Sequence, residues 1–117
     1  MNIHGIGIDI EKVERFEKML SAPGRLEKIF TRREIAYCKK FAHPSQRLAA
    51  RFAAKEAVYK ALGADQKKIK LREIEILNTP KGAPIVNLKS MNHKFHLFIS
   101  LSHTPSEAIA FSIVLKG

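Results

Sequence analysis

The segment spanning residues 51–63 constrains the fold of this chain more than any other stretch of the sequence. Its residues are mostly strong helix formers, and Gly63 stands where glycine commonly follows the last turn of a helix. At helical spacing, small or β-branched side chains share one face of this helix, namely Ala53, Ala54, Ala57, Val58 and Ala61. A face this smooth predicts close packing against another element.

Glu56 and Lys60 lie in a stripe beside that smooth face. A carboxylate next to a tightly packed surface must be matched by a cation or a metal, because burying an unpaired charge is costly. The simpler interpretation is an ordinary pair one helical turn apart, which would stabilise the helix by about 0.2–0.5 kcal/mol. Taken alone, the helix favours this simpler interpretation.

The chain of 117 residues carries 21 Lys and Arg against 11 Asp and Glu, a net charge of +10. Its length predicts a single domain over residues 1–117. The positive charge favours an acidic partner, which could be nucleic acid, an anionic membrane, an acidic protein or a phosphorylated ligand. No stretch is long and apolar enough to span a bilayer, and no signal peptide is visible. We therefore expect a cytoplasmic protein that does not bind membranes.

Cys38 is the only cysteine of the chain. An intramolecular disulfide is therefore excluded, and so is a zinc site built from several cysteines. We expect this thiol to be half-buried or on the surface.

The first strand is predicted from a strict alternation over residues 3–10. One face carries Ile6, Ile8 and Ile10, and the other carries Gly5, Gly7 and Asp9. Glycines weaken a strand, so this face predicts a close approach of backbone or ligand. Asp9 would either cap the helix that follows or belong to a site.

The remaining elements follow from periodicity and from turn residues. Helices are expected over residues 11–20, 25–30, 31–41 and 46–62, and a capping box of Thr31 and Glu34 opens the third. Strands are expected over residues 69–77, 85–88, 95–102 and 108–115, the last two pairing as antiparallel neighbours. This order predicts an α+β fold in which an antiparallel sheet packs against the long Ala-rich helix.

Three polar residues stand out against apolar surroundings, namely Asp9, Glu56 and His103. The two carboxylates suggest a Mg²⁺ site, because Mg²⁺ is typically held by one or two carboxylates together with substrate phosphates. Lys60, one turn after Glu56, would add positive charge beside those phosphates, as phosphoryl transfer requires. The simpler interpretation of His103 is a histidine in a turn.

Taken in order, several blocks of the chain resemble the small bacterial holo-acyl-carrier-protein synthases, a family of 4′-phosphopantetheinyl transferases. The blocks are residues 5–10 with Arg15, then 30–34, 51–57, 60–63 and 100–104. The most specific of them is Phe-Ala-Ala-Lys-Glu-Ala, with an aspartate upstream. The resemblance covers essentially the whole chain and implies the fold of that family.

The resemblance also implies an activity. Phosphopantetheine would pass from coenzyme A to a serine of apo acyl carrier protein, with release of adenosine 3′,5′-bisphosphate, in fatty acid biosynthesis. Asp9, Glu56 and Lys60 would be the catalytic residues, with Asp9 and Glu56 as the Mg²⁺ ligands and Lys60 beside the pyrophosphate. The base that takes the serine proton would be Glu56 or a metal-ordered water.

The same resemblance implies binding residues and an assembly. Arg15 would receive the acidic carrier protein. Family members are trimers with active sites between protomers, so Asp9 and Glu56 would come from one chain and some coenzyme contacts from its neighbour. The residues expected to bind coenzyme A are Arg51, Lys60, Gly63, Pro84, His103 and Thr104.

A small basic nucleic-acid-binding protein is the alternative from another functional class. The charge of the chain fits this alternative. The aromatic residues do not, because they are mostly phenylalanines on apolar faces rather than rings interleaved with Lys and Arg. No nucleic-acid-binding motif is recognised, so we expect no nucleic-acid partner.

Overall fold

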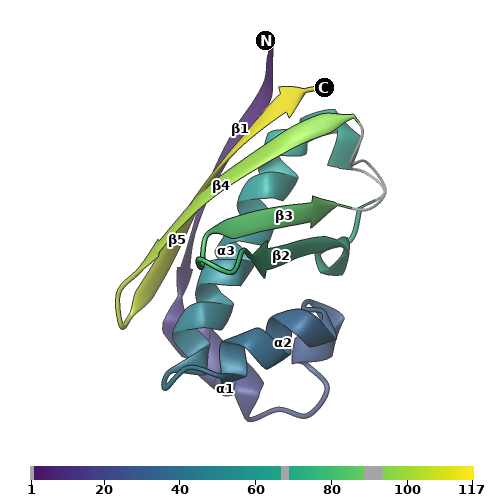
Figure 1. The fold of residues 1–117 in the computed structure, drawn as a ribbon. Helices are drawn as coiled ribbons and strands as arrows, with labels where there is room; N and C mark the ends of the chain where they lie inside the picture. The colour runs from purple at the N-terminus through teal and green to yellow at the C-terminus, as the bar shows by residue number, and fades with distance from the viewer. Residues whose placement is uncertain (1, 67–68, 89–93) are drawn as a thin grey trace.

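The computed structural model describes residues 2–66, 69–88 and 94–117 (Figure 1). Along the chain the elements are β1 (Ile3–Lys12), α1 (Val13–Leu20), η1 (Leu26–Lys28), α2 (Arg32–Lys39), α3 (Pro44–Leu62), η2 (Gly63–Gln66), η3 (Leu71–Glu73), β2 (Ile74–Asn78), β3 (Pro84–Leu88), β4 (Phe95–His103) and β5 (Glu107–Lys116). The fold is α+β, as predicted. Within these residues no helix is long and apolar enough to cross a membrane.

Two antiparallel sheets are built on the long helix α3. The larger sheet has the strand order β1-β5-β4, and β2 pairs with β3 in a separate two-stranded sheet. Figure 1 shows α3 running alongside both sheets, with α1 and α2 gathered at one end of it. The predicted antiparallel pairing of the last two strands is confirmed, for example by Ile99 opposite Ser112.

The close contact between β1 and α3 depends on two glycines. A Cβ atom placed on Gly5 would lie 2.0 Å from the carbonyl oxygen of Ala61, and one on Gly7 would lie 1.9 Å from that of Ala57. Real Cβ atoms do not approach an oxygen so closely, so only glycine fits at both positions. The expected close approach of backbone on this face of β1 is therefore confirmed.

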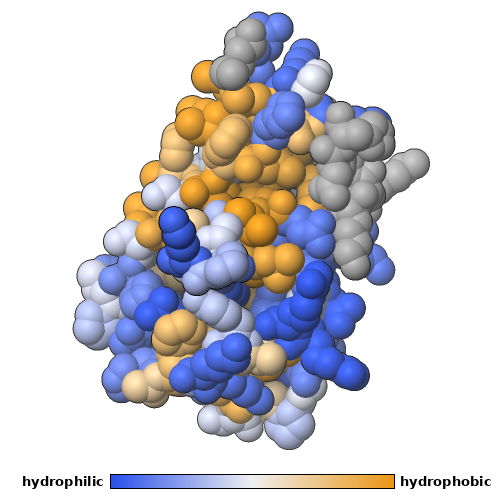
Figure 2. Space-filling view, in the orientation of Figure 1, coloured by the Kyte–Doolittle hydropathy of each residue, from blue (hydrophilic) through white to orange (hydrophobic). Residues whose placement is uncertain are grey.

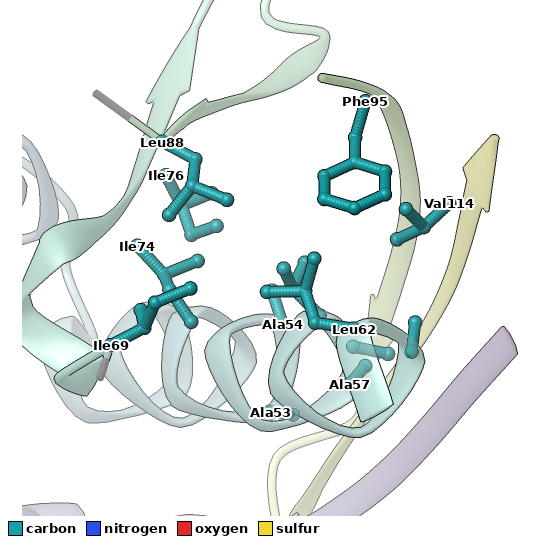
Figure 3. Packing of buried hydrophobic residues seen from close by; sticks show 13 residues of the cluster. Ala53, Ala54, Ala57, Leu62, Ile69, Ile74, Ile76, Leu88, Phe95 and Val114 are labelled. Atoms are coloured by element: carbon teal, nitrogen blue, oxygen red, sulfur yellow. The ribbon is translucent and has the colours of Figure 1, made fainter. Parts of the chain in front are cut away.

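The hydrophobic core consists of two clusters of buried side chains, which pack against successive parts of α3. Toward the middle and C-terminal end of α3, Figure 3 shows side chains of both sheets turned toward the helix, among them Ile76, Leu88, Phe95 and Val114. Near its N-terminal end, a second cluster is centred on Phe16, Phe30 and Phe52, from α1, the segment before α2, and α3. The helix thus belongs to both clusters.

A fully buried ion pair ties α2 to α3. The Nζ atom of Lys55 lies 2.8 Å from Oε1 of Glu34, and neither side chain is exposed. Lys55 also donates to the carbonyl oxygens of Leu71 at 3.0 Å and Ile74 at 2.7 Å, while Glu34 accepts from the backbone N–H of Ile76 at 2.9 Å. Burial lowers the pKa of Lys55, and the charge of Glu34 opposes that effect. These bonds hold β2 and η3 against both helices.

The outer face of the three-stranded sheet is apolar and exposed. Ile6, Ile8 and Ile10 are 62%, 57% and 59% exposed. They pair across the sheet with Ile113, Phe111 and Ile109 of β5, and Phe98 of β4 lies beyond Ile113. Figure 2 shows hydrophobic surface over the half of the molecule that carries this sheet. The glycine face of β1 is therefore its buried face, and the isoleucine face is open.

Two boundaries differ from the predictions. The strand β1 continues to Lys12, because Glu11 and Lys12 still pair with Ala108 and Glu107, so the first helix begins at Val13 rather than at residue 11. The strand predicted over residues 69–77 begins only at Ile74. Before it, the carboxylate of Glu73 accepts the backbone N–H of Lys70 at 3.0 Å and closes the short turn η3.

Two predictions around α2 and α3 are wrong. The helix predicted over residues 46–62 begins two residues earlier, at Pro44, in the first turn where proline costs no hydrogen bond. Cys38 is fully buried rather than half-buried or on the surface. Burial raises the pKa of its thiol to about 11, although the nearby Arg51 guanidinium opposes the shift.

Candidate functional site

The first group of candidate residues lies where β1 meets α3. The Nζ atom of Lys60 donates to Oδ1 of Asp9 at 3.2 Å and to the carbonyl oxygen of Ile8 at 3.0 Å. Lys60 therefore reaches across to β1, and its ion pair among the described residues is with Asp9 rather than with Glu56. The simple one-turn pair on α3 is thus not the arrangement found. Asp9 does not cap α1 either, because α1 begins after Lys12 with no side-chain cap.

Carboxylates crowd this region. The pKa of Glu56 is raised by burial and then by the charge of Asp9, while Lys60 and Arg15 oppose the shift. Burial, followed by the neighbouring carboxylate of Asp9, raises the pKa of Glu11 to about 7, while Arg15 opposes the shift. Glu11 lies two residues after Asp9 on the same face of β1. Negative charge is therefore in excess here, which favours a bound cation.

The donor set fits a hard divalent cation. The Oδ2 atom of Asp9 is buried and has no hydrogen-bond partner among the described residues. Carboxylate oxygens are the ligands that Mg²⁺ prefers. In the described parts of the chain no three acidic, His or Cys side chains converge tightly enough to cage an ion. Asp9 and Glu56 would supply two carboxylates, and Mg²⁺ is typically held by one or two carboxylates together with waters and substrate phosphates.

Arg15 lies at the rim of this group. Its guanidinium donates to Oε1 of Glu11 at 3.2 Å and lies 4.7 Å from the centre of the Phe52 ring. The Arg15 side chain is nevertheless 50% exposed. It is thus fixed in direction and open to a partner. The sequence did not single out Glu11, because the strand was expected to stop at residue 10. The alternation of the strand, continued past residue 10, would have placed Glu11 on the same face as Asp9, because the two residues are two positions apart.

The second group of candidate residues lines a cavity of about 430 Å³. Its walls come from α2, α3, the β2–β3 hairpin and β4. They include Tyr37, Arg47, Arg51, Asn78, Gly82, Pro84, Ser100, Ser102 and His103.

Two buried nitrogen atoms at this cavity lack partners. Arg51 is only 3% exposed, and its guanidinium donates to Oδ1 of Asn78 and lies over the ring of Tyr37. Its Nε atom and the Nδ1 atom of His103 are buried without a hydrogen bond among the described residues. Because buried polar groups are nearly always paired, a polar ligand in this cavity would satisfy both atoms. His103 ends strand β4 and is not a turn residue, so the simpler interpretation of it is wrong.

The structure therefore brings the predicted residues together in two groups rather than one. Asp9, Glu56 and Lys60 form the first, and Arg51, Pro84 and His103 belong to the second. Arg51 and Lys60 are nine residues apart on α3, about two and a half turns, so they project from opposite sides of the helix.

The two remaining predicted residues lie at the ends of elements. Gly63 ends α3 with φ of 59°, a conformation that favours glycine. The hydroxyl oxygen of Thr104 accepts the backbone N–H of Glu107 at 3.1 Å and closes the turn between β4 and β5. Thr104 therefore lies in the turn, directly after His103 at the end of β4.

Among the polar residues of the cavity, sequence reasoning missed Tyr37, Arg47 and Asn78. Arg47 could have been found, because it lies one turn before Arg51 on the same side of α3. Tyr37 and Asn78 gave no local signal. They reach the cavity only because α2 and β2 pack beside α3.

Comparison with known proteins relates nearly the full length of the chain to one superfamily. The profile of the 4′-phosphopantetheinyl transferase superfamily matches residues 5–114. The holo-[acyl-carrier-protein] synthase of Thermodesulfovibrio yellowstonii is 45% identical over 114 residues, which cover 96% of this chain and 98% of that one. The synthase of Clostridium botulinum (strain Eklund 17B) is 40% identical, with 96% and 97% of the two chains covered.

Solved structures show the same fold. A holo-(acyl-carrier-protein) synthase from Bacillus anthracis, in complex with CoA (3′,5′-ADP), superposes with a TM-score of 0.85 at 34% identity, covering 98% of each chain. The synthase of Helicobacter pylori, in complex with coenzyme A, gives a TM-score of 0.77 at 32% identity and covers 94% of this chain and 99% of that one.

Proposed function

Because the chain belongs to the 4′-phosphopantetheinyl transferase superfamily, we propose that it transfers 4′-phosphopantetheine from coenzyme A to a serine of apo acyl carrier protein. In this reaction the serine Oγ forms a bond to the β-phosphorus of coenzyme A. The bond from that phosphorus to the bridging oxygen breaks, and adenosine 3′,5′-bisphosphate leaves. The relatives that match over nearly the full length are holo-acyl-carrier-protein synthases, which supports this choice of acceptor.

The observation that carries the proposal is the group formed by Asp9, Glu56 and Lys60. Asp9 and Glu56 would hold Mg²⁺, which when bound neutralises charge on the pyrophosphate. Lys60, already directed at Asp9, would stabilise the negative charge that develops on the leaving bisphosphate. The raised pKa of Glu56 suits it to take the serine proton, directly or through an ordered water.

The two groups of residues on opposite sides of α3 support an active site shared between copies of the chain. One coenzyme molecule would contact Asp9, Glu56 and Lys60 of one protomer and Arg51 and His103 of the next. The exposed apolar face of the sheet supports association of copies, because monomeric proteins seldom leave such a contiguous face open. We propose a homotrimer assembled through this face.

The basic charge of the chain would then steer the acidic carrier protein to the site. Arg15 supports this role, because Glu11 and Phe52 fix its guanidinium beside the carboxylates while half of the side chain stays exposed. The on-rate of the carrier protein would fall as salt rises. Apart from the net charge, no feature of the residues that the structure describes favours the nucleic-acid-binding alternative.

The deciding experiment is intact-mass analysis of apo acyl carrier protein incubated with the protein, coenzyme A and Mg²⁺. We expect a gain of one phosphopantetheine arm, and no gain when a chelator replaces the metal. A carrier protein of unchanged mass in the complete reaction would overturn the proposed function. A full gain in the presence of chelator would overturn the metal assignment alone.

A further inference from the structure

The carboxylate of Glu11 has charged neighbours on two sides. Near the end of β1, Glu11 pairs with Ala108 of β5, and its side chain shares the glycine face of the strand with Asp9, two positions earlier. On the other side, its Oε1 atom accepts a hydrogen bond from the Arg15 guanidinium at 3.2 Å. Only 14% of the Glu11 side chain is exposed, against 50% of the Arg15 side chain. Glu11 therefore connects the carboxylates of the first group to a cation that a partner can reach.

The charge of Arg15 acts on this whole group of carboxylates. Burial is the main cause that raises the pKa of Glu11 and of Glu56, and the carboxylate of Asp9 is the next. Arg15 opposes both shifts, so its charge is felt at each of the two carboxylates. Among the described residues, two cations, Arg15 and Lys60, thus face three carboxylates. A divalent cation bound to the group would reverse this excess of negative charge.

Arg15 is the cation of the group that can change its partner. The ring of Phe52 holds the guanidinium, with the guanidinium carbon 4.7 Å from the ring centre. A guanidinium has five N–H donors, so Arg15 can pair with another carboxylate without leaving this ring. Lys60 is tied more firmly to β1, because it also donates to the carbonyl oxygen of Ile8 at 3.0 Å.

We propose that Glu11 is a positioning residue that makes carrier-protein binding and Mg²⁺ binding depend on each other through Arg15. This inference rests on the proposed function. With Mg²⁺ bound, the negative charge of Glu11 is offset, and its hold on Arg15 weakens. The guanidinium then pairs more readily with an acidic side chain of the carrier protein. The effect is reciprocal, because two ligands that are coupled change each other's affinity by the same factor.

Direct binding tests this coupling without turnover. Calorimetry would measure the affinity of the full-length protein for a carrier protein whose acceptor serine is replaced by alanine, so that no transfer takes place. Coenzyme A is left out, and Mg²⁺ is compared with a chelator at equal ionic strength. The pH is set to about 8, above the pKa of about 7 that Glu11 has. We expect Mg²⁺ to tighten binding by about fivefold, the factor that corresponds to one partly exposed ion pair.

Three variants separate this role from a general effect of charge. Without Mg²⁺, Glu11→Gln should bind the carrier protein about fivefold more tightly than the unaltered protein, and Mg²⁺ should then add less than about twofold. Glu14→Gln removes the same charge from an exposed position of α1, where Glu14 pairs with Lys18 at 3.6 Å, and it should keep the full effect of Mg²⁺. In an Arg15→Gln background, adding Glu11→Gln should change the affinity by less than about twofold. Thermal unfolding would confirm that each variant is folded.

Two outcomes would overturn the inference. One is that Mg²⁺ changes carrier-protein affinity by the same factor in the unaltered protein and in Glu11→Gln, including no change in either. The other is that Glu11→Gln gains as much affinity in the Arg15→Gln background, because Glu11 would then repel the carrier protein directly rather than compete for Arg15. If the unaltered protein bound no carrier protein with or without Mg²⁺, the proposed function itself would fail. The two failures are therefore distinguishable.

Discussion

The side chain of Lys60 joins α3 to β1 through its ion pair with Asp9, whose atoms Nζ and Oδ1 are 3.2 Å apart. The neighbouring Glu56 contributes a second carboxylate, and its pKa is raised in part by the charge of Asp9. Asp9 lies 47 positions before Glu56 in the sequence, yet the glycine face of β1 brings it to the same place as Glu56 and Lys60. The first predictions concern this group and the packing that forms it.

Glu56→Gln should remove turnover without harming the fold. The substitution deletes a proposed metal ligand, so we expect kcat to fall by a factor on the order of 10²–10³. Because Asp9 and Glu56 repel each other, the thermal midpoint without Mg²⁺ should stay the same or rise. Phosphopantetheine transfer and differential scanning calorimetry measure the two effects. A variant with near-normal kcat would refute the metal assignment.

Gly7→Ala should destabilise the protein and also reduce its activity. The new Cβ would lie 1.9 Å from the carbonyl oxygen of Ala57, so β1 must move away from α3. We expect a loss of about 1–3 kcal/mol or more in the free energy of unfolding, measured by urea denaturation. Gly24→Ala is a suitable control. Its Cβ meets nothing within 4 Å, so its cost is the backbone strain of an alanine at φ of 78°, about 1–2 kcal/mol, and it should keep its activity.

Removing one member of the Lys55–Glu34 pair should be costly. Lys55→Met leaves the carboxylate of Glu34 buried without its cation, and we expect a loss of about 3–5 kcal/mol in the free energy of unfolding. The double variant Lys55→Met with Glu34→Gln should recover part of this loss, because no buried charge then lacks a partner. Urea denaturation of both single variants and of the double variant gives the coupling free energy between the Lys55 and Glu34 side chains. Additive effects would show that the two side chains do not depend on each other.

Cys38 should react slowly with thiol reagents in the folded protein. Its side chain is buried, and burial raises the pKa of the thiol from 9.0 to about 11. A disulfide reagent added at pH 8 should modify the native protein far more slowly than the urea-unfolded protein. Equal rates in the two states would contradict the burial.

The raised pKa of Cys38 predicts that the free energy of unfolding depends on pH. A group whose pKa is higher in the folded than in the unfolded state keeps its full stabilising contribution below the unfolded pKa. This contribution should therefore be present below pH 9 and lost as the pH rises toward 11. The Cys38→Ala variant should lack this component, which comparison of the two denaturation curves across that range would detect.

Arg15→Glu should weaken recognition of the carrier protein and leave coenzyme A affinity unchanged. The substitution reverses a charge that is half exposed and replaces its ion pair with Glu11 by a repulsion. We expect a raised KM for the carrier protein and a shallower dependence of that KM on salt. Arg32→Glu, which makes the same charge reversal on α2, is the control. Equal losses for carrier protein and coenzyme would refute the role of Arg15 in recognition.

Local patterns were sufficient to predict much of the fold. The capping box of Thr31 and Glu34 is present, and the glycines of β1 approach the helix as expected. Both features depend on residues close in sequence or on a strict period. The end of β1 at Lys12 could not be predicted, because it depends on how far β5 pairs with it.

The candidate site was predicted only in part, for the same reason. Asp9, Glu56 and Lys60 were identified by spacing and by the resemblance, and their roles stay predictions until they are tested. Tyr37 and Asn78 lie on elements whose packing beside α3 is decided by the buried pair of Lys55 and Glu34 and by the apolar clusters. No window of sequence contains that information.

The opposite placement of Arg51 and Lys60 on α3 has a genetic consequence. In the proposed trimer, each copy of this helix serves two different active sites. An allele damaged at Asp9 and another damaged at Arg51 would each be inactive alone. Expressed together, they would form mixed trimers. In some active sites of these trimers, an intact Asp9 would come from one copy and an intact Arg51 from its neighbour. The two alleles would therefore complement each other, whereas two alleles damaged on the same side of the helix would not.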